Sequence, residues 1–264
     1  MIEALNIAES GLHATQKWID SISNNVANMQ TVGYKKMSVN FSNMVNQPAT
    51  TGASAATADN QEHSSYGIGT QIASVNSVFT SGSIKSTKNE LDVAIQGNGF
   101  FEVIRSDGTF AYTRAGQFKV NSDGALTTRD GLPLSADIRV PPDVSSIQIE
   151  ANGNLKGLVA STGEVIELGE LRVANVIDPQ SLKAVGNGLY VNDSSANDSA
   201  DKITLESAGT NGTGQLLQGF LEMSNVDLIE EMSSLVLAQR AYQLNARIIQ
   251  TADQVMETIN NLRR

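Results

Sequence analysis

The sequence predicts an α+β protein in which two long terminal helices, paired as a coiled-coil-like bundle, enclose a mainly antiparallel β region. Three observations predict this class. Residues 224–262 have helical periodicity and contain neither Pro nor Gly. The first 29 residues repeat apolar positions at steps of three and four. Between the two ends, short runs of alternating hydrophobicity are separated by Gly-containing turns.

The N-terminal region, residues 1–36, is predicted to form one helix from about residue 2 to about residue 29. One row on this helix alternates steps of three and four without a break, which is typical of a coiled-coil seam. The row consists of Leu5, Ala8, Leu12, Thr15, Ile19, Ile22, Val26 and Met29. Gly33 can supply the positive φ of a helix stop, and Lys35 and Lys36 suit the negative end of the helix dipole.

Residues 37–66 are predicted to form an extended segment followed by a polar arm. Residues 48–65 are small and polar and have no hydrophobic period. A connection of this length inside a compact domain is often functional. We therefore predict an exposed arm at residues 48–65.

Residues 67–218 are predicted to form a β-rich outer region, which could divide into two submodules near residue 141. The alternating runs are separated by turns at residues 106–108, 121–124 and 129–131, each of which contains a Gly. Glycine supplies the positive φ of a tight hairpin. The pattern therefore predicts an antiparallel meander.

The C-terminal region, residues 219–264, is predicted to form the second long helix. Its apolar arc covers about half of the helix surface. The main row contains Leu237, Ala241, Leu244, Ile248, Ala252, Val255, Ile259 and Leu262, and Tyr242 widens it. A single neighbour cannot cover an arc of this width, so we predict association with further copies of the chain. The alternative is a helical hairpin buried in the core of a monomer.

This reasoning selects the apolar residues that are predicted to mediate subunit assembly. They are Leu5, Leu12, Ile19, Ile22 and Val26 on the first helix and Leu237, Tyr242, Leu244, Ile248, Val255 and Ile259 on the second.

Composition excludes several classes of function. The net charge is −10 and Lys and Arg form no cluster, which disfavours nucleic-acid binding. No apolar run approaches the roughly 20 residues that span a bilayer, so direct membrane insertion is not expected. The N-terminus lacks the basic and apolar regions of a cleavable signal peptide, so we expect any export to proceed without one. The absence of Cys excludes disulfides and thiolate metal sites.

The sequence offers little material for an enzyme. His13 and His63 are the only histidines, so a His-based triad or metal cluster is not expected. The segments 97–99 and 186–188 resemble fragments of phosphate-binding loops, but neither extends to a complete motif. Glu230 and Glu231 are adjacent on a helix and point about 100° apart, so we interpret them as support for the helix dipole. We predict no catalytic, cofactor-binding or metal-binding residues, and no enzymatic activity.

Four segments resemble bacterial flagellar basal-body rod and hook proteins. Residues 23–35, SNNVANMQTVGYK, resemble the N-terminal signature of this axial protein family. Residues 97–101, GNGFF, and 111–118, AYTRAGQF, resemble its central β region. Residues 218–227, QGFLEMSNVD, and 239–245, QRAYQLN, resemble the lead-in and the middle of its last helix. The chain is most similar to distal rod subunits, although Trp18 departs from the polar residue expected at that position.

The resemblance implies a structural subunit that polymerises helically into the flagellar rod, the drive shaft that connects motor to hook. It implies a place in the basal body across the periplasm and export through the flagellar export apparatus. The expected partners are the chain itself, other rod subunits, the hook protein, and the periplasmic and outer-membrane rings that act as a bushing. Carried over by position, Asn24, Asn25 and Asn28 would fix how the first helix ends and meets its neighbours; alternatively, they bond only to nearby backbone.

Two other functions remain open at this point. One is a proximal rod or hook-type axial subunit, which belongs to the same class of protein. The other is a monomeric periplasmic β-domain binding module with a helical stalk. Filament formation would distinguish an axial subunit from the binding module.

Overall fold

The computed structural model describes residues 2–46, 66–161, 163–192 and 203–262, and the arm predicted at residues 48–65 lies outside them. Contacts between residues divide the chain into two compact units. The helical unit comprises residues 1–26, 37–76 and 228–264. The β unit comprises residues 27–36 and 77–227.

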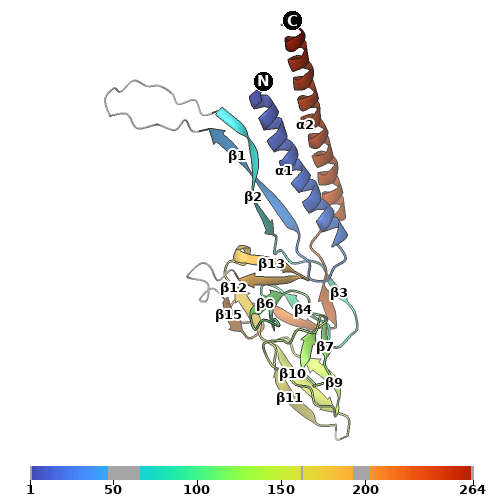
Figure 1. Ribbon diagram of the computed structural model, residues 1–264. Helices are drawn as coiled ribbons and strands as arrows, with labels where there is room; N and C mark the ends of the chain where they lie inside the picture. Colours follow the sequence, from blue (N-terminus) through green and yellow to red (C-terminus); the bar gives the residue numbers. More distant parts are fainter. Residues whose placement is uncertain (1, 47–65, 162, 193–202, 263–264) are drawn as a thin grey trace, which may run out of the picture. The chain divides into compact units, whose positions relative to one another are not determined.

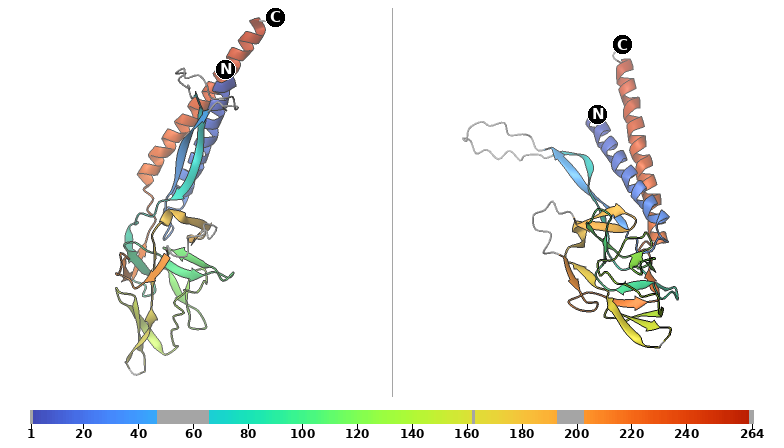
Figure 2. Two further views of the ribbon diagram at one scale, coloured as in Figure 1. Left: turned by 90° about the vertical axis from the view of Figure 1, so that its left-hand side faces the viewer. Right: turned by 60° about the horizontal axis from the view of Figure 1, so that its bottom comes forward.

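The helical unit is built from two helices and a two-stranded sheet. Its elements are α1 (Ile2–Ala27), β1 (Met37–Asn46), β2 (Tyr66–Ser77) and α2 (Leu228–Leu262). The helices lie side by side with the two chain termini at the same end, and β1 and β2 run in opposite directions along α1 (Figure 1). The views in Figure 2 show the same arrangement. The long terminal helices predicted from periodicity are therefore present, and α2 begins four residues later than predicted, at Leu228 rather than at residue 224.

The sheet of the helical unit packs on α1 through an aromatic contact and several hydrogen bonds. The Trp18 ring meets the Phe41 ring edge to face, with 5.9 Å between the ring centroids. The Thr70 amide donates to Ser10 Oγ at 3.3 Å. Trp18, which departs from the family pattern, is thus half-buried against β1. The sequence predicted the residues of β1 only as an extended segment.

The β unit contains fifteen strands and one short 3₁₀ helix among the described residues. They are β3 (Ile84–Ser86), β4 (Val93–Gln96), β5 (Phe101–Ile104), β6 (Phe110–Thr113), β7 (Phe118–Val120), β8 (Leu126–Thr128), β9 (Val144–Ile149), β10 (Asn154–Val159), β11 (Val165–Glu170), β12 (Val173–Val176), η1 (Pro179–Ser181), β13 (Leu182–Gly186), β14 (Leu189–Asn192), β15 (Ile203–Glu206), β16 (Gln215–Gln218) and β17 (Phe220–Glu222).

Strand pairing in the β unit is antiparallel, as the sequence predicted. The largest sheets have the orders β13-β14-β6-β5 and β11-β10-β9. Three further pairs are non-local: β4 pairs with β16, β3 with β17, and β12 with β15. The last strands before α2 therefore return to pair with the first strands of the unit. The α+β class with a mainly antiparallel middle region is confirmed.

The alternation of side chains along β5 creates two cores. Phe101 is fully buried in the larger core and meets the Phe118 ring, with centroids 5.0 Å apart. The preceding Phe100 points to the opposite face, in a smaller core with Tyr112 and Tyr190. Ile138 and Ile149, on either side of the predicted division near residue 141, share the larger core.

The segment 97–99 connects β4 to β5, and its glycines are explained by packing. Gly99 has φ +121°, and a Cβ at this position would lie 2.2 Å from Val173 Cγ1. A side chain therefore cannot be accommodated without displacing Val173. This close approach of two strands accounts for the glycine without any phosphate ligand.

We predict that Phe101→Ala destabilises the β unit by about 3–5 kcal/mol, because it removes a ring from a closely packed core. Phe110→Ala makes the same chemical change on the paired strand, where the side chain is 51 % exposed, and should have a much smaller effect. Urea unfolding followed by circular dichroism measures both. Equal losses of stability for the two variants would contradict this assignment of the core.

Candidate assembly helices and a buried ionic cluster

Asn25 joins three segments of the helical unit. Its side chain is buried, and its Nδ2 donates to the Met37 carbonyl at 2.9 Å and to Glu231 Oε2 at 3.2 Å. Its Oδ1 accepts from the Met37 amide at 2.9 Å. One amide group therefore ties the end of α1 to the start of β1 and to the first turn of α2.

A second contact between the helices lies two heptads away. A Cβ on Gly11 would lie 2.8 Å from Asn245 Nδ2, so α1 and α2 approach closely there. The contacts are separated by 14 residues on either helix, from 11 to 25 on α1 and from 231 to 245 on α2. Ala238, midway between Glu231 and Asn245, is fully buried. The face of α2 turned toward α1 is thus a line at seven-residue spacing that includes one Ala and two polar residues.

The predicted assembly residues on α1 differ in their exposure. Ile22 is buried, at 2 % exposure. Asn24 is exposed, and Asn28 is half-buried with its Oδ1 accepting from Thr31 Oγ1 at 3.2 Å. The remaining predicted residues on this helix are all half-buried: Leu5, Leu12, Ile19 and Val26.

The predicted assembly residues on α2 are all exposed within the single chain. Their exposed fractions are Leu237 60 %, Tyr242 40 %, Leu244 63 %, Ile248 47 %, Val255 46 % and Ile259 53 %. Apart from Ile259, these side chains do not lie on the seven-residue line through Ala238 that faces α1. With Leu262, which is 82 % exposed, we call Leu237, Leu244, Ile248, Val255 and Ile259 the apolar stripe.

Sequence reasoning missed a second exposed apolar surface near the start of α2. Ile229, Met232 and Val236 are 81 %, 54 % and 50 % exposed. Their spacing of three and four residues places them on one face of the helix. At 100° per residue this face lies about 100° from the apolar stripe. We call these three residues the apolar patch.

In the β unit, three charged side chains form a buried ionic cluster. Lys35 Nζ lies 2.7 Å from Glu222 Oε1, and an Arg114 Nη lies 3.2 Å from Glu222 Oε2. Lys35 is 1 % exposed, Arg114 is 3 % exposed and Glu222 is 1 % exposed. Arg114 also stacks on Phe100, with its Cζ 5.1 Å from the ring centroid. Two cationic side chains thus share one carboxylate in the protein interior, where an unpaired charge has a high free-energy cost.

Backbone groups complete the coordination of Glu222. The Gly82 amide donates to Glu222 Oε1 at 2.9 Å, and the Gly33 amide donates to the Glu222 carbonyl at 2.9 Å. Gly33 has φ +70°, and a Cβ there would lie 2.6 Å from the Ala115 nitrogen. The positive φ predicted for Gly33 is present, but α1 already ends at Ala27, so this glycine serves a close approach to the segment after β6 and does not stop the helix.

Asn225 adds a second set of cross-links beside the cluster. Its Oδ1 accepts from the Lys36 amide at 2.7 Å. Its Nδ2 donates to the Val78 carbonyl and to Thr80 Oγ1, both at 2.8 Å. Lys35 Nζ also donates to the Thr80 carbonyl at 2.8 Å. Three chain segments that are remote in sequence are therefore bonded to one another.

One prediction from helix electrostatics needs correction and another is incomplete. Lys35 is predicted to lie at the negative end of the first helix, but α1 ends at Ala27 and the Lys35 ammonium pairs with Glu222. Glu231 lies in the first turn of α2, as the dipole prediction requires, but it is also 2 % exposed and accepts from Asn25. Each residue thus has a buried partner from a distant segment, which the local pattern does not indicate.

The pKa values in the cluster follow from burial. Burial lowers the pKa of the Lys35 ammonium below its usual value of 10.5, and the hydrogen bond and negative charge of Glu222 partly oppose this effect. Burial lowers the pKa of the Arg114 guanidinium as well. The carboxylate therefore compensates the cost of burying two cations only in part.

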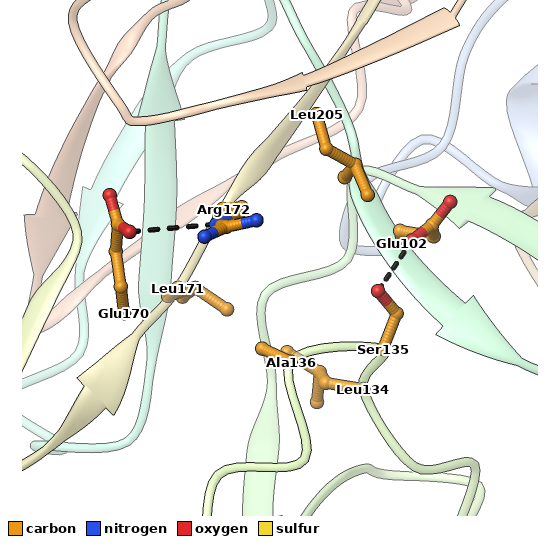
Figure 3. A pocket seen from close by; sticks show the side chains of 8 residues that line it. All are labelled: Glu102, Leu134, Ser135, Ala136, Glu170, Leu171, Arg172 and Leu205. Carbon is orange, nitrogen blue, oxygen red and sulfur yellow. Dashed lines mark hydrogen bonds and ion pairs between the residues drawn. The ribbon is translucent and has the colours of Figure 1, made fainter.

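A polar pocket of about 380 Å³ lies elsewhere in the β unit (Figure 3). Glu102 accepts a hydrogen bond from Ser135 Oγ, and the Tyr112 hydroxyl lies 3.4 Å from the same carboxylate. Burial, with the nearby Glu102 charge, raises the pKa of Tyr112 to about 12. Across the pocket, Arg172 pairs with Glu170 at 3.5 Å. Each charged group on the walls thus has a partner within the chain.

No group of three or more His, Cys, Asp or Glu residues in the described ranges could hold a metal ion. Among the helices with described residues, none is long and apolar enough to cross a membrane.

Comparison with known proteins identifies the class of protein. Residues 5–35 match the family profile described as flagella basal body rod protein. Residues 94–157 match the D1 domain of the flagellar hook protein FlgE/F/G, and residues 217–262 match the C-terminal region of the flagellar basal body rod proteins FlgEFG. Each matched segment supplies one residue of the ionic cluster: Lys35, Arg114 and Glu222. The chain is therefore an axial protein of the flagellar rod and hook class.

Relatives define the family within this class. The chain is 37 % identical to the flagellar basal-body rod protein FlgG of Borreliella burgdorferi, over 100 % of both chains. It is 35 % identical to FlgG of Bacillus subtilis over 100 % of both chains, and 34 % identical to FlgG of Caulobacter vibrioides over 99 % of this chain and 100 % of the relative. The chain belongs to the FlgG family of flagellar basal-body rod proteins.

Membership in this family confirms the function predicted from the resemblance. The chain is a structural subunit of the flagellar basal-body rod, and neither a hook-type subunit nor a monomeric binding module is favoured.

Lys35 gives a testable dependence of stability on pH. Its pKa is lower in the folded protein than in the unfolded chain, so between the two values the unfolded chain binds more protons. The contribution of this group to the free energy of unfolding therefore rises with pH across that window. We predict that Lys35→Met flattens the rise relative to the wild type. Urea unfolding at a series of pH values up to 10.5 measures this slope, and identical slopes for the two proteins would refute the prediction.

Proposed function

We propose that the chain polymerises helically through its terminal helices, and that the polymer is the rod that connects motor to hook and transmits torque. The observation that carries this proposal is the apolar stripe on α2. Its six side chains are between 46 % and 82 % exposed in the single chain. Fully burying a side chain of this size contributes about 1.5–3 kcal/mol, so their burial between subunits is a large driving force.

Within each subunit, we propose that α1 and α2 pair in the manner of a coiled coil. The strict alternation of three and four residues on α1 supports this pairing. The contacts at Gly11 with Asn245 and at Asn25 with Glu231 are also spaced by two heptads on both helices. The apolar stripe is exposed in the single chain and is therefore available to other subunits.

The two exposed apolar surfaces of α2 favour an open assembly. The apolar stripe covers the C-terminal two thirds of the helix, and the apolar patch lies on a different face near its start. Two dissimilar surfaces suit a head-to-tail contact, in which one surface of a subunit meets a different surface of the next. When the rotation between such subunits does not close a ring, the product is a helical filament.

The family also indicates the partners of this polymer. Rod and hook proteins share the matched segments, so assembly with other rod subunits and with the hook protein is the expected extension of self-association. We further propose that the outer surface of the rod runs in the periplasmic and outer-membrane rings. We propose that the export apparatus delivers the chain without removal of a signal peptide.

We predict that Leu244→Asp prevents polymerisation and leaves the stability of the dilute monomer unchanged. Leu244 is 63 % exposed in the single chain, but a carboxylate there would be buried without a partner in every subunit contact. Sedimentation and electron microscopy of the concentrated protein measure assembly, and thermal unfolding measures monomer stability.

The matched control is Gln254→Asp. Gln254 is also exposed, points about 100° away from Val255 of the apolar stripe, and lies 18 residues beyond Val236, the last residue of the apolar patch. This variant should form filaments. Normal filaments of the Leu244→Asp variant would exclude the apolar stripe as an assembly surface.

A further inference from the structure

The chain passes between the two compact units four times, after residues 26, 36, 76 and 227. Each passage is a single backbone segment. If these segments were independent, a force on the terminal helices would extend or twist each of them separately. These four segments are the covalent connections between the two units.

Three of the four segments are bonded to one another where they enter the β unit. The Val78 amide donates to the Lys36 carbonyl at 2.8 Å. This bond joins the segment that leaves the β unit after residue 36 to the segment that enters it after residue 76. Asn225 bonds to Lys36 and to Val78, which joins the last segment to both. Lys35 Nζ bridges the Thr80 carbonyl and Glu222 Oε1. Every pair among the three segments is therefore linked directly.

The charges of the ionic cluster make these links costly to separate. Lys35 and Glu222 come from different segments, and both side chains are almost fully buried. Pulling the segments apart would leave a buried cation or carboxylate without its partner, which costs far more than the loss of an exposed ion pair. Arg114, from the segment after β6, pairs with the same carboxylate. It therefore connects the three bonded segments, which we call the junction, to the strands of the β unit.

We propose that Lys35, Glu222 and Asn225 form a clamp, which Arg114 anchors to the strands of the β unit. The clamp makes the three bonded chain segments respond to force as one body. This inference rests on the proposed function, in which the rod carries torque. The clamp residues are positioning residues, because they hold these chain segments in place. Their polar character gives the junction a defined set of partners, whereas apolar side chains of similar volume could slide or repack.

Hydrogen exchange on the full-length, dilute protein tests the clamp directly. Asn225→Ala removes the cross-links to Lys36, Val78 and Thr80 without creating an unpaired buried charge. We expect the amides of Lys36 and Val78 to exchange at least about tenfold faster, since several hydrogen bonds are lost. The amides of β4 and β5, in the core of the unit, should keep their protection.

Two further variants sharpen this experiment. Glu222→Gln leaves two buried cations without a carboxylate and should accelerate exchange at Gly33 and Gly82 more strongly than Asn225→Ala does. Asn121→Ala is the control, because Asn121 is exposed and its side chain bonds only to the adjacent Ser122. If Glu222→Gln does not fold, Asn225→Ala and its control still decide the outcome. Equal acceleration in β4, β5 and the junction, or no acceleration anywhere, would overturn the clamp.

Measuring the stiffness of the filaments distinguishes failure of the clamp proposal from failure of the proposed polymerisation. The Asn225→Ala variant retains the apolar stripe and should polymerise, but its filaments should bend more, with a shorter persistence length in electron micrographs. Filaments as stiff as the wild type would overturn the mechanical role, even if exchange at the junction increased. If the wild-type protein forms no filaments at all, polymerisation fails while the exchange result still decides whether the clamp exists.

Discussion

The Glu222 carboxylate is the group on which the organisation of this molecule depends. It compensates two buried cations, Lys35 and Arg114, and its backbone carbonyl accepts from Gly33. It lies on the last strand before α2, whereas Lys35 lies shortly after α1. A single acidic side chain thus holds the segments that follow the first helix and precede the second. Because the site excludes water, its interactions are stronger than those of surface ion pairs and its loss is correspondingly more costly.

The two units differ in how they bury their apolar side chains. The β unit buries Phe101, Phe118 and their neighbours in a core of its own, and strands that are distant in sequence close it. The helical unit cannot do this. Its longer helix has 35 residues and extends about 52 Å at 1.5 Å per residue, but the six side chains of its apolar stripe are 46–82 % exposed in the single chain. Its remaining apolar surface is consistent with a protein whose folding is completed by neighbouring subunits.

The sequence predicted features that depend on local pattern. Periodicity located both helices, and alternation with Gly turns indicated the antiparallel strands. It also identified Leu244 and Ile248 as part of an apolar surface too wide for one partner, and both are exposed in the single chain. The same reasoning missed the buried partners of Lys35 and Glu231, because a charge near a helix end has a plausible local partner in the helix dipole. Nothing in the neighbouring residues reveals that the true partner is elsewhere.

By itself, the sequence determined the elements, their amphipathic faces and the membership of a family, because these follow from the spacing of residues close together in the chain. Only the tertiary structure decided which polar groups meet. Lys35 and Glu222 are 187 residues apart, and Asn25 and Glu231 are 206 apart. Such pairs form because strand pairing and helix packing bring their backbones together, and side chains with opposite charge or complementary hydrogen bonding then avoid the cost of burial. The physical reason is that burial is a property of the folded chain, and no local pattern encodes it.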